Sequence, residues 1–385
     1  MELRVYNTEL TPQGVVDEIL SLLWTPTYWN EGTVGDFKLL VPMTENNKKL
    51  LVKGNIVVLH DGAADYTDET GSWRRAAQIR YRHFTKDVEG AEQIEVQGHL
   101  LKKWLGKRIV LNKIVMNGTE QEKINRIVTE NHGTGAAARR QFQRFTVLQQ
   151  EDLGGSSTEY ANEDFINAGV EIYNKALAGK LGYDILVNEY TGQYGFWLYK
   201  GKNLTSGNTE GNTPAIFSRD FDNVNEQEYT ESDEGKKNVM YVTGAADEEG
   251  TVLLVEVDQG GEGLERDEVY VDMSSVSRKY TENEVEITIP EAEYVKLLEA
   301  AAADGLEDYG ETISFTASIN ITSNLKYGED FNLGDRVTCI EKNWGIRIDV
   351  RITAVCLAYQ NGTKEIEATL GESLPTLLQK IRKVR

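Results

Sequence analysis

The stretch from Thr312 to Gly371 constrains the fold of this chain more than any other. It contains four runs typical of β-strands, separated by polar or glycine-bearing breaks. The third run alternates between apolar and mostly charged residues, which predicts a strand with one buried face. The apolar face would hold Ile346, Ile348, Val350, Ile352, Ala354 and Cys356, and the polar face Arg347, Asp349, Arg351 and Thr353. Four strands so close in sequence indicate an antiparallel sandwich or a small barrel, with a tight turn at Gly334.

A similar β-rich unit is predicted at the N-terminal end of the chain. A short amphipathic helix at Leu100–Leu105 would cover it, because its apolar residues share one side. The strands that we expect are Glu2–Glu9, Leu20–Tyr28, Gly35–Pro42, Gly54–His60, Trp73–His83 and Gln93–Val96. Two β-modules at the two ends of the chain are therefore the main structural expectation.

The region between the modules mixes helices and strands. Thr119 followed by Glu122 is a capping-box pattern, which predicts a helix to about His132. We also expect a strand at Gln141–Gln149, a helix at Asn162–Ala178, and a hairpin of Tyr183–Asn188 and Tyr194–Tyr199. Residues 201–235 are rich in Gly, Asn, Thr and acidic residues, which is typical of a loop exposed to water.

Two further helices complete the expected element order. Pro290 would open a helix at its favoured first position, with Gly305 just past its end, and Leu374–Val384 would close the chain. The predicted fold class is α+β, mostly β, with two β-barrel-like tube modules and an α+β insertion between them. The expected domains are 1–115, the N-terminal tube domain; 116–235, the insertion; 236–311, a β-rich linker domain with one helix; and 312–385, the C-terminal tube domain.

The balance of charges argues against one class of function. The chain has 62 acidic against 41 basic residues, a formal net charge of −21. A protein that wraps nucleic acid depends on a basic surface, so this class is disfavoured, although a channel through which DNA slides remains open. No apolar run reaches the length of a membrane span, and no N-terminal signal precedes the first strand. We expect a soluble protein made in a cytoplasm.

Two small groups of residues have a structural and a functional interpretation. Arg74, Arg75, Arg80 and Arg82 form a local basic cluster, which we interpret as edge or solvent-face arginines that pair with acids. An interface with an acidic partner subunit is the alternative. Cys339 and Cys356 lie in neighbouring predicted strands, and we expect two reduced core thiols.

No constellation of residues indicates an enzyme. His60, His83, His99 and His132 are scattered and show no metal-ligand spacing, and the chain has no G-x-S-x-G motif. Among 62 carboxylates, neighbours such as Asp267 and Glu268 arise by chance. The aromatic residues that crowd one hairpin favour packing over a carbohydrate platform; they are Tyr190, Tyr194, Phe196, Trp197 and Tyr199. We therefore predict no catalytic, cofactor-binding or metal-binding residues and no cofactor.

Three stretches, in their order and spacing, resemble a known family. They run from Leu3 to Pro42, from Asn238 to Met273 and from Phe331 to Gly371. Together they resemble the tail-hub proteins of long-tailed, siphovirus-type bacteriophages, which close the distal end of the tail tube. The resemblance extends over nearly the whole chain, although no single motif in it is strongly specific. Such hubs are similar to the baseplate hub of contractile tails.

The resemblance implies a structural function in the virion tail. Two tube domains per chain and three chains around an axis would form a pseudo-sixfold ring, matching a six-fold tube on one side and a three-fold tip on the other. The implied partners are two further copies of the chain, the tail tube and distal tail proteins, tip or receptor-binding proteins, and DNA that passes without specific binding. Many relatives continue into a peptidase, lysin or receptor-binding part, whereas this chain ends at Arg385.

Two alternatives remain open from the sequence. The chain could be a tail protein that binds envelope carbohydrate or degrades peptidoglycan, with its site in the insertion. It could also be the hub of a related contractile injection device, since the resemblance does not separate the two.

Overall fold

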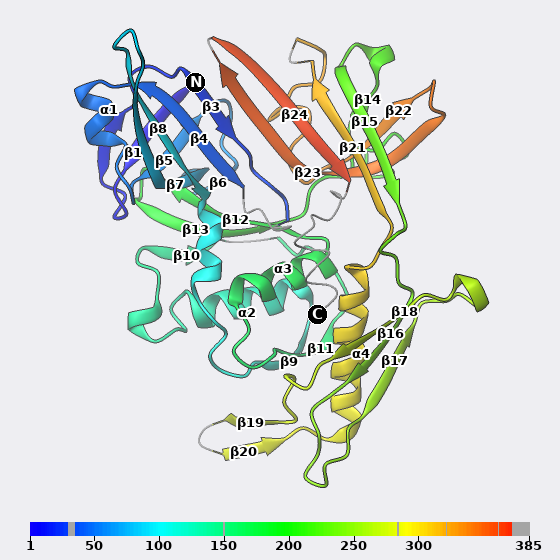
Figure 1. Ribbon diagram of the computed structural model, residues 1–385. Coiled ribbons are helices and arrows are strands. Elements are labelled where there is room, and N and C mark those ends of the chain that lie inside the picture. Colours follow the sequence, from blue (N-terminus) through cyan, green and yellow to red (C-terminus); the bar gives the residue numbers. More distant parts are fainter. Residues whose placement is uncertain (30–34, 149–150, 283–284, 321, 361, 372–385) are drawn as a thin grey trace.

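The computed structural model describes residues 1–29, 35–148, 151–282, 285–320, 322–360 and 362–371. The described chain is mostly β, as predicted. Figure 1 shows two sheets side by side at the top of the view, helices α2 and α3 beneath them, and a small sheet with α4 at the lower right. The predicted helix Leu374–Val384 lies outside the described residues.

The N-terminal sheet is antiparallel, and the short strand β2 lies at one of its edges. Its hydrogen-bonded order is β2, β1, β5, β7, β8, β4 and β3. The elements of this part are β1 (Glu2–Tyr6), β2 (Pro12–Val15), β3 (Ser21–Trp24), β4 (Asp36–Pro42), α1 (Glu45–Leu50), β5 (Ile56–His60), β6 (Tyr66–Asp68), β7 (Gly71–Lys86) and β8 (Glu92–Leu100). Every strand predicted here exists, and β2 and β6 were not predicted. The cover at residues 100–105 is the 3₁₀ helix η1 (Leu101–Lys107).

The C-terminal sheet takes strands from two distant parts of the sequence. β23 (Ile346–Gln360), β24 (Thr363–Gly371), β21 (Thr312–Ile319) and β15 (Val224–Ser232) pair in this order. β22 (Arg336–Glu341) pairs with the first half of β23, and β14 (Ile216–Phe217) lies parallel to β22. The prediction of an exposed loop at 201–235 is therefore wrong for these two segments. The composition suggested a loop because a strand with one solvent-exposed face carries the same polar residues as a loop.

One β-bulge overturns the predicted faces of β23. The register with β24 shifts between Ile352 and Ala354, and such a shift moves every later side chain to the opposite face. Ile352 is buried as predicted, but the core then continues through Val355 and Leu357. Ala354 and Cys356 are consequently on the other face, and Cys356 is half-buried.

The middle of the chain packs beneath the two sheets. Its elements are β9 (Val115–Gly118), α2 (Glu120–Asn131), η2 (Ala138–Arg140), β10 (Phe145–Val147), β11 (Thr158–Ala161), α3 (Ala168–Ala178), β12 (Gly182–Asn188), β13 (Gln193–Tyr199) and η3 (Arg219–Phe221). The capping box of α2 and the hairpin of β12 and β13 confirm their predictions. The helix predicted at Asn162–Ala178 begins only at Ala168, because the Asn167 side chain caps it and Phe165 has φ +59°. The predicted strand Gln141–Gln149 is reduced to β10.

A second, smaller core lies under α4. It is built by β16 (Val239–Thr243), β17 (Leu254–Asp258), η4 (Gly263–Glu265), β18 (Glu268–Asp272), the hairpin β19 (Lys279–Glu282) and β20 (Val285–Thr288), and α4 (Glu291–Glu307). Met240 and Val242 face Tyr294 and Leu298 of the helix. The predicted helix exists, but Pro290 is its N-cap residue and not its first helical residue, and Gly305 lies inside the helix and not after it. The division into four domains stays a prediction.

Candidate assembly surfaces

The two end sheets are joined into one by a strand pair. Ser21–Trp24 of β3 runs antiparallel to Leu357–Gln360 of β23. Two backbone hydrogen bonds extend the contact beyond β3, from Tyr28 N to Thr353 O at 2.7 Å and from Val355 N to Pro26 O at 3.1 Å. Strands therefore follow one another without interruption from β2 to β15. Among the described residues β2 pairs only with β1, and β15 pairs only with β21.

Tyr28 stabilises the joint, as we call the pairing of β3 with β23. Its ring is completely buried and lies edge-on to Tyr199, with 5.3 Å between the ring centroids. A Cβ added to Gly334 would lie 2.4 Å from this ring, and Gly334 has φ +95°, as the predicted turn requires. The segment after β3, the strand β13 and the turn before β22 therefore meet at one side chain.

The face of the joined sheet that points away from the core is acidic. Residues directly opposite one another in the ladders share this face, from Glu226 and Ser318 to Glu367 and Cys356. Lys38 on the same face pairs with Glu95 at 2.9 Å. The carboxylates of this acidic sheet face are Asp36, Glu95, Glu226, Glu228, Glu365 and Glu367.

The arginines of β7 do not form one surface. Arg75 is buried, where its Nε donates to Asp184 at 2.6 Å and its Nη2 to the Tyr199 hydroxyl at 3.0 Å, and it also pairs with Asp65. Burial alone would lower the pKa of its guanidinium, but the nearby charges of Asp65 and Asp184 raise that pKa well above its ordinary value. The interpretation of four edge or solvent-face arginines is thus wrong for Arg75. Through its bond to Asp184, Arg75 links β7 to β12.

Two of the other three arginines form local contacts. Arg74 donates to the carbonyls of Gly62 and Ala63. Arg82 donates to the Lys48 carbonyl, and its guanidinium lies 4.4 Å from the Phe84 ring centroid. Arg80 is exposed and forms no ion pair with a described residue.

The four histidines lie apart, in structural surroundings. His132 is buried and its Nε2 lies 2.9 Å from the Leu105 carbonyl, while burial lowers its pKa to about 4 and keeps the ring neutral. His60 lies 2.7 Å from Glu189, and His99 lies 2.7 Å from Asp36. His83 packs against Tyr81. Across the described ranges no group of three or more His, Cys, Asp or Glu residues is placed to hold a metal ion, and no described helix is long and apolar enough to cross a membrane.

The hairpin aromatics serve packing, with one exception. Trp197 stacks on Tyr199, and Tyr194 lies edge-on to Trp104. Phe196 is buried, whereas Tyr190 is exposed at the turn. Cys339 and Cys356 are both free thiols, and burial raises the pKa of each.

Sequence reasoning missed a polar cluster that ties α4 to the middle helices. Lys175 of α3 pairs with Asp304 of α4, and Lys123 pairs with Glu120. Glu171 accepts a hydrogen bond from the Tyr160 hydroxyl at 2.8 Å, and burial raises the pKa of this carboxyl. A spacing pattern could not reveal the whole cluster, because α2, α3, α4 and Tyr160 of β11 each contribute to it.

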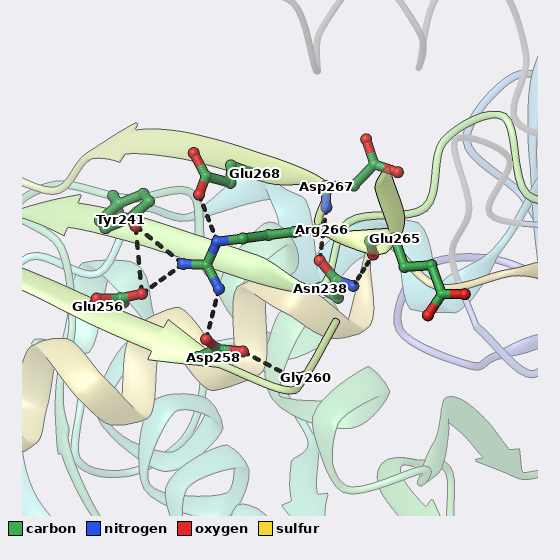
Figure 2. A network of polar contacts seen from close by, with 9 residues as sticks. All are labelled: Asn238, Tyr241, Glu256, Asp258, Gly260, Glu265, Arg266, Asp267 and Glu268. Carbon is green, nitrogen blue, oxygen red and sulfur yellow. Dashed lines mark hydrogen bonds and ion pairs between the residues drawn. The ribbon is translucent and has the colours of Figure 1, made fainter. Parts of the chain in front are cut away.

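The outer face of the small sheet carries the densest ion-pair network of the described chain (Figure 2). Arg266 lies across the three strands and reaches Glu256 and Asp258 of β17 and Glu268 of β18, each at 2.6 Å. Its Nη2 also donates to the Tyr241 hydroxyl at 3.0 Å. Bonds to these partners raise the pKa of Arg266 above its ordinary value. Of the neighbours Asp267 and Glu268, Glu268 belongs to this network and Asp267 pairs with Lys237 at 3.4 Å.

Solved structures share this fold at low sequence identity. The 43 kDa tail protein of prophage MuSo2 from Shewanella oneidensis matches with a TM-score of 0.55 and 11% identity, covering 96% of this chain and 98% of that one. The prophage tail protein gp18 from Listeria monocytogenes matches with a TM-score of 0.54 and 13% identity, over 100% and 98% of the two chains. The tail protein from Neisseria meningitidis matches with a TM-score of 0.53 and 12% identity, over 97% and 96%.

The sequence itself matches one family. No curated protein matches the chain. Residues 2–372 match the family described as siphovirus ReqiPepy6 Gp37-like protein. This match confirms the resemblance to a family of long-tailed phages, and the shared fold of the three tail proteins agrees with it. The chain therefore belongs to the siphovirus ReqiPepy6 Gp37-like protein family.

Proposed function

We propose that this chain is a structural hub of the phage tail. It closes the distal end of the tail tube and connects the tube to the tip, as a homotrimeric ring that adapts six-fold to three-fold symmetry and lets the genome pass. Membership of a siphovirus family and the fold of three tail proteins support a place in the virion tail.

The continuous sheet from β2 to β15 carries the proposal. Joined through β3 and β23, it presents one strand edge at each end. Unpaired strand edges are templates for pairing with another chain. If β15 of one copy meets β2 of the next, three copies close a ring that contains six sheet halves. The six sheet halves are similar but not identical, so such a ring presents six similar surfaces to a six-fold tube.

The acidic sheet face suits the wall of a channel for DNA. Its carboxylates outnumber its cations, and negative charge at the wall repels the phosphates of a passing duplex. The genome would then slide without binding. We further propose that the hub has no enzyme activity, which the fold shared with three tail proteins supports.

The test is the solution mass of the purified chain, followed by class averages in negative stain. Light scattering across a range of concentrations should give three times 43.2 kDa, and the images a ring with a central hole. A monomer at every concentration that binds or degrades envelope polysaccharide or peptidoglycan would contradict the hub and favour the alternative function. A double variant, E226K/E228K, tests the channel wall: it should increase DNA retention by the ring.

A further inference from the structure

A group of cations without acidic partners lies on the side of the molecule opposite the small sheet. In a chain with net charge −21, these side chains form no ion pair with a described residue. We call them the basic patch, and its members are Arg80, Lys107, Arg108, Arg139, Arg140 and Arg144. Arg80 lies in the middle of β7, Lys107 ends the 3₁₀ helix η1, which is cyan in Figure 1, and the four other arginines lie between η1 and β10.

Contacts and nearby charges link Arg80, Lys107, Arg108 and Arg140, and Arg139 precedes Arg140 in η2. Arg108 Nε donates to the Arg140 carbonyl at 3.0 Å, and its guanidinium lies 5.0 Å from the Phe142 ring centroid. Phe142 lies edge-on to Trp104, and the Lys107 amine lies 4.5 Å from the Trp104 ring centroid. Although much of the Lys107 side chain is exposed, burial of its amine, then the charges of Arg80 and Arg108, lower its pKa to about 8. The aromatic rings hold the cations in place.

The small sheet presents the opposite charge. Its outer face and the turn before β18 carry exposed carboxylates at Glu256, Asp258, Glu262, Glu265, Asp267, Glu268 and Asp272. Arg266 and Lys237 neutralise part of this charge and leave an excess of acids. We call this surface the acidic outer face. α4 covers the other side of the sheet, so the acidic outer face points away from the rest of the molecule (Figure 1).

Both surfaces also expose apolar side chains. Leu254 and Tyr270 on the acidic outer face are 63% and 60% exposed, and Ile109 and Leu111 beside Arg108 are 43% and 48% exposed. Apolar side chains with a charged rim are typical of protein interfaces. The two surfaces are therefore complementary in charge and similar in composition.

We propose that the acidic outer face of one copy docks on the basic patch of the next copy, in the ring that the proposed function assumes. The two surfaces are different parts of the chain, as a head-to-tail contact that closes around an axis requires. They therefore form a second contact between neighbouring copies, below the paired sheet edges. The opposite charges of the basic patch and the acidic outer face favour this contact, because two surfaces of like charge would repel each other.

Duplex DNA suits the basic patch less well than a second copy does. DNA binding depends on cations that are free to reach many phosphates. Here the guanidinium groups of Arg108, Arg140 and Arg144 already donate to main-chain carbonyls. A neighbouring surface with fixed carboxylates needs fewer free donors.

Zero-length cross-linking of a mixture of isotopically labelled and unlabelled chains tests the contact. A carbodiimide joins amines to carboxylates that already touch. Because its pKa is about 8, Lys107 keeps a larger unprotonated share near neutral pH than an ordinary lysine, which makes it a good reporter. We expect mixed-isotope cross-links from Lys107 or Lys103 to carboxylates of residues 256–272. Their absence at every concentration overturns the proposed contact.

The same data separate this contact from the ring itself. A trimer whose cross-links between chains lie elsewhere overturns the contact and leaves the hub function standing. A monomer without cross-links contradicts both in the isolated chain. DNA binding that R80E/R139E abolishes, with no cross-links between chains, would instead make the basic patch a nucleic-acid surface.

Charge reversal gives an independent readout. R80E/R139E removes two exposed cations for which no hydrogen bond is seen in the described chain, and should raise the dissociation constant of the trimer about tenfold. E262R/E265R should do the same, and the combined variant should recover most of the affinity. K53E/K236E is the matched control, because it makes the same change in net charge at exposed lysines outside both surfaces. Equal weakening by the control, or no recovery in the combined variant, contradicts the contact.

Discussion

Lys102 is a buried cation whose cost can be worked out from its surroundings. The side chain is 1% exposed, its amine donates to the Thr27 carbonyl, and it lies 5.3 Å from the Tyr183 ring centroid. Burial lowers its pKa from 10.5 to about 8, against the attraction of Asp184. A difference of this size corresponds to about 3 kcal/mol of lost stability while the amine is protonated in both states.

The sign of the pH dependence follows from the direction of the change. The folded-state pKa lies below the unfolded one, so between pH 8 and 10.5 the unfolded chain binds a proton that the folded chain has lost. Stability contributed by this group therefore rises with pH across that window. Below it, the full penalty remains.

Lys102→Met keeps the length of the side chain and removes the charge. The loss of the bond to Thr27 costs about 1 kcal/mol, so the variant should be more stable than the parent by about 2 kcal/mol near pH 7. The advantage should shrink by about 2 kcal/mol at about pH 9.5, where the parent amine is neutral in the folded state.

Urea unfolding at the two pH values measures this difference. Comparing variant with parent cancels the other groups that titrate in the same range, such as Lys107 and Lys113, whose pKa values burial also lowers. Lys53→Met, at an exposed site, is the control and should change stability by less than about 0.5 kcal/mol. A variant less stable than the parent near neutral pH, or an advantage that is the same at both pH values, would refute the reasoning.

Three further substitutions test the joint and one local signal. Trp24→Ala, at a site 3% exposed, should cost about 3–5 kcal/mol in urea unfolding and speed amide exchange in β3 and β23; unchanged exchange there would contradict its role in the joint. Gly334→Ala should cost more than Gly328→Ala, because both have positive φ but only the first would press a Cβ against Tyr28. Equal losses of stability in the two variants would show that the contact of residue 334 with Tyr28 contributes nothing. Thr119→Ala should cost about 1 kcal/mol and Thr119→Ser much less, since serine keeps the hydroxyl that caps α2; equal thermal midpoints would show that the cap is dispensable.

Local signals account for the elements that the sequence predicted correctly. The cap of α2 depends on Thr119 and Glu122, three residues apart, and the hairpin of β12 and β13 depends on two runs around Thr191 and Gly192. The first half of β23 follows simple alternation up to Ile352. Such features are decided between near neighbours in the chain, so composition and period reveal them.

Contacts between residues distant in the sequence determine the features that local patterns did not predict. β15 has the composition of a loop and becomes a strand because β21 offers it an edge, and the bulge after Ile352 moves Cys356 out of the core. Arg75 is indistinguishable in sequence from its exposed neighbours until Asp184 approaches from β12.

The same division applies to the candidate assembly surfaces. Residue type and order were sufficient to predict a chain that is mostly β, acidic, and similar over nearly its whole length to a phage tail family. The three-dimensional fold was needed to see that β3 pairs with β23, that the carboxylates gather on one sheet face, and that Arg108 lies beside Arg140. A strand pattern states which face is apolar but never which strand lies beside it, since backbone hydrogen bonds are the same for every partner.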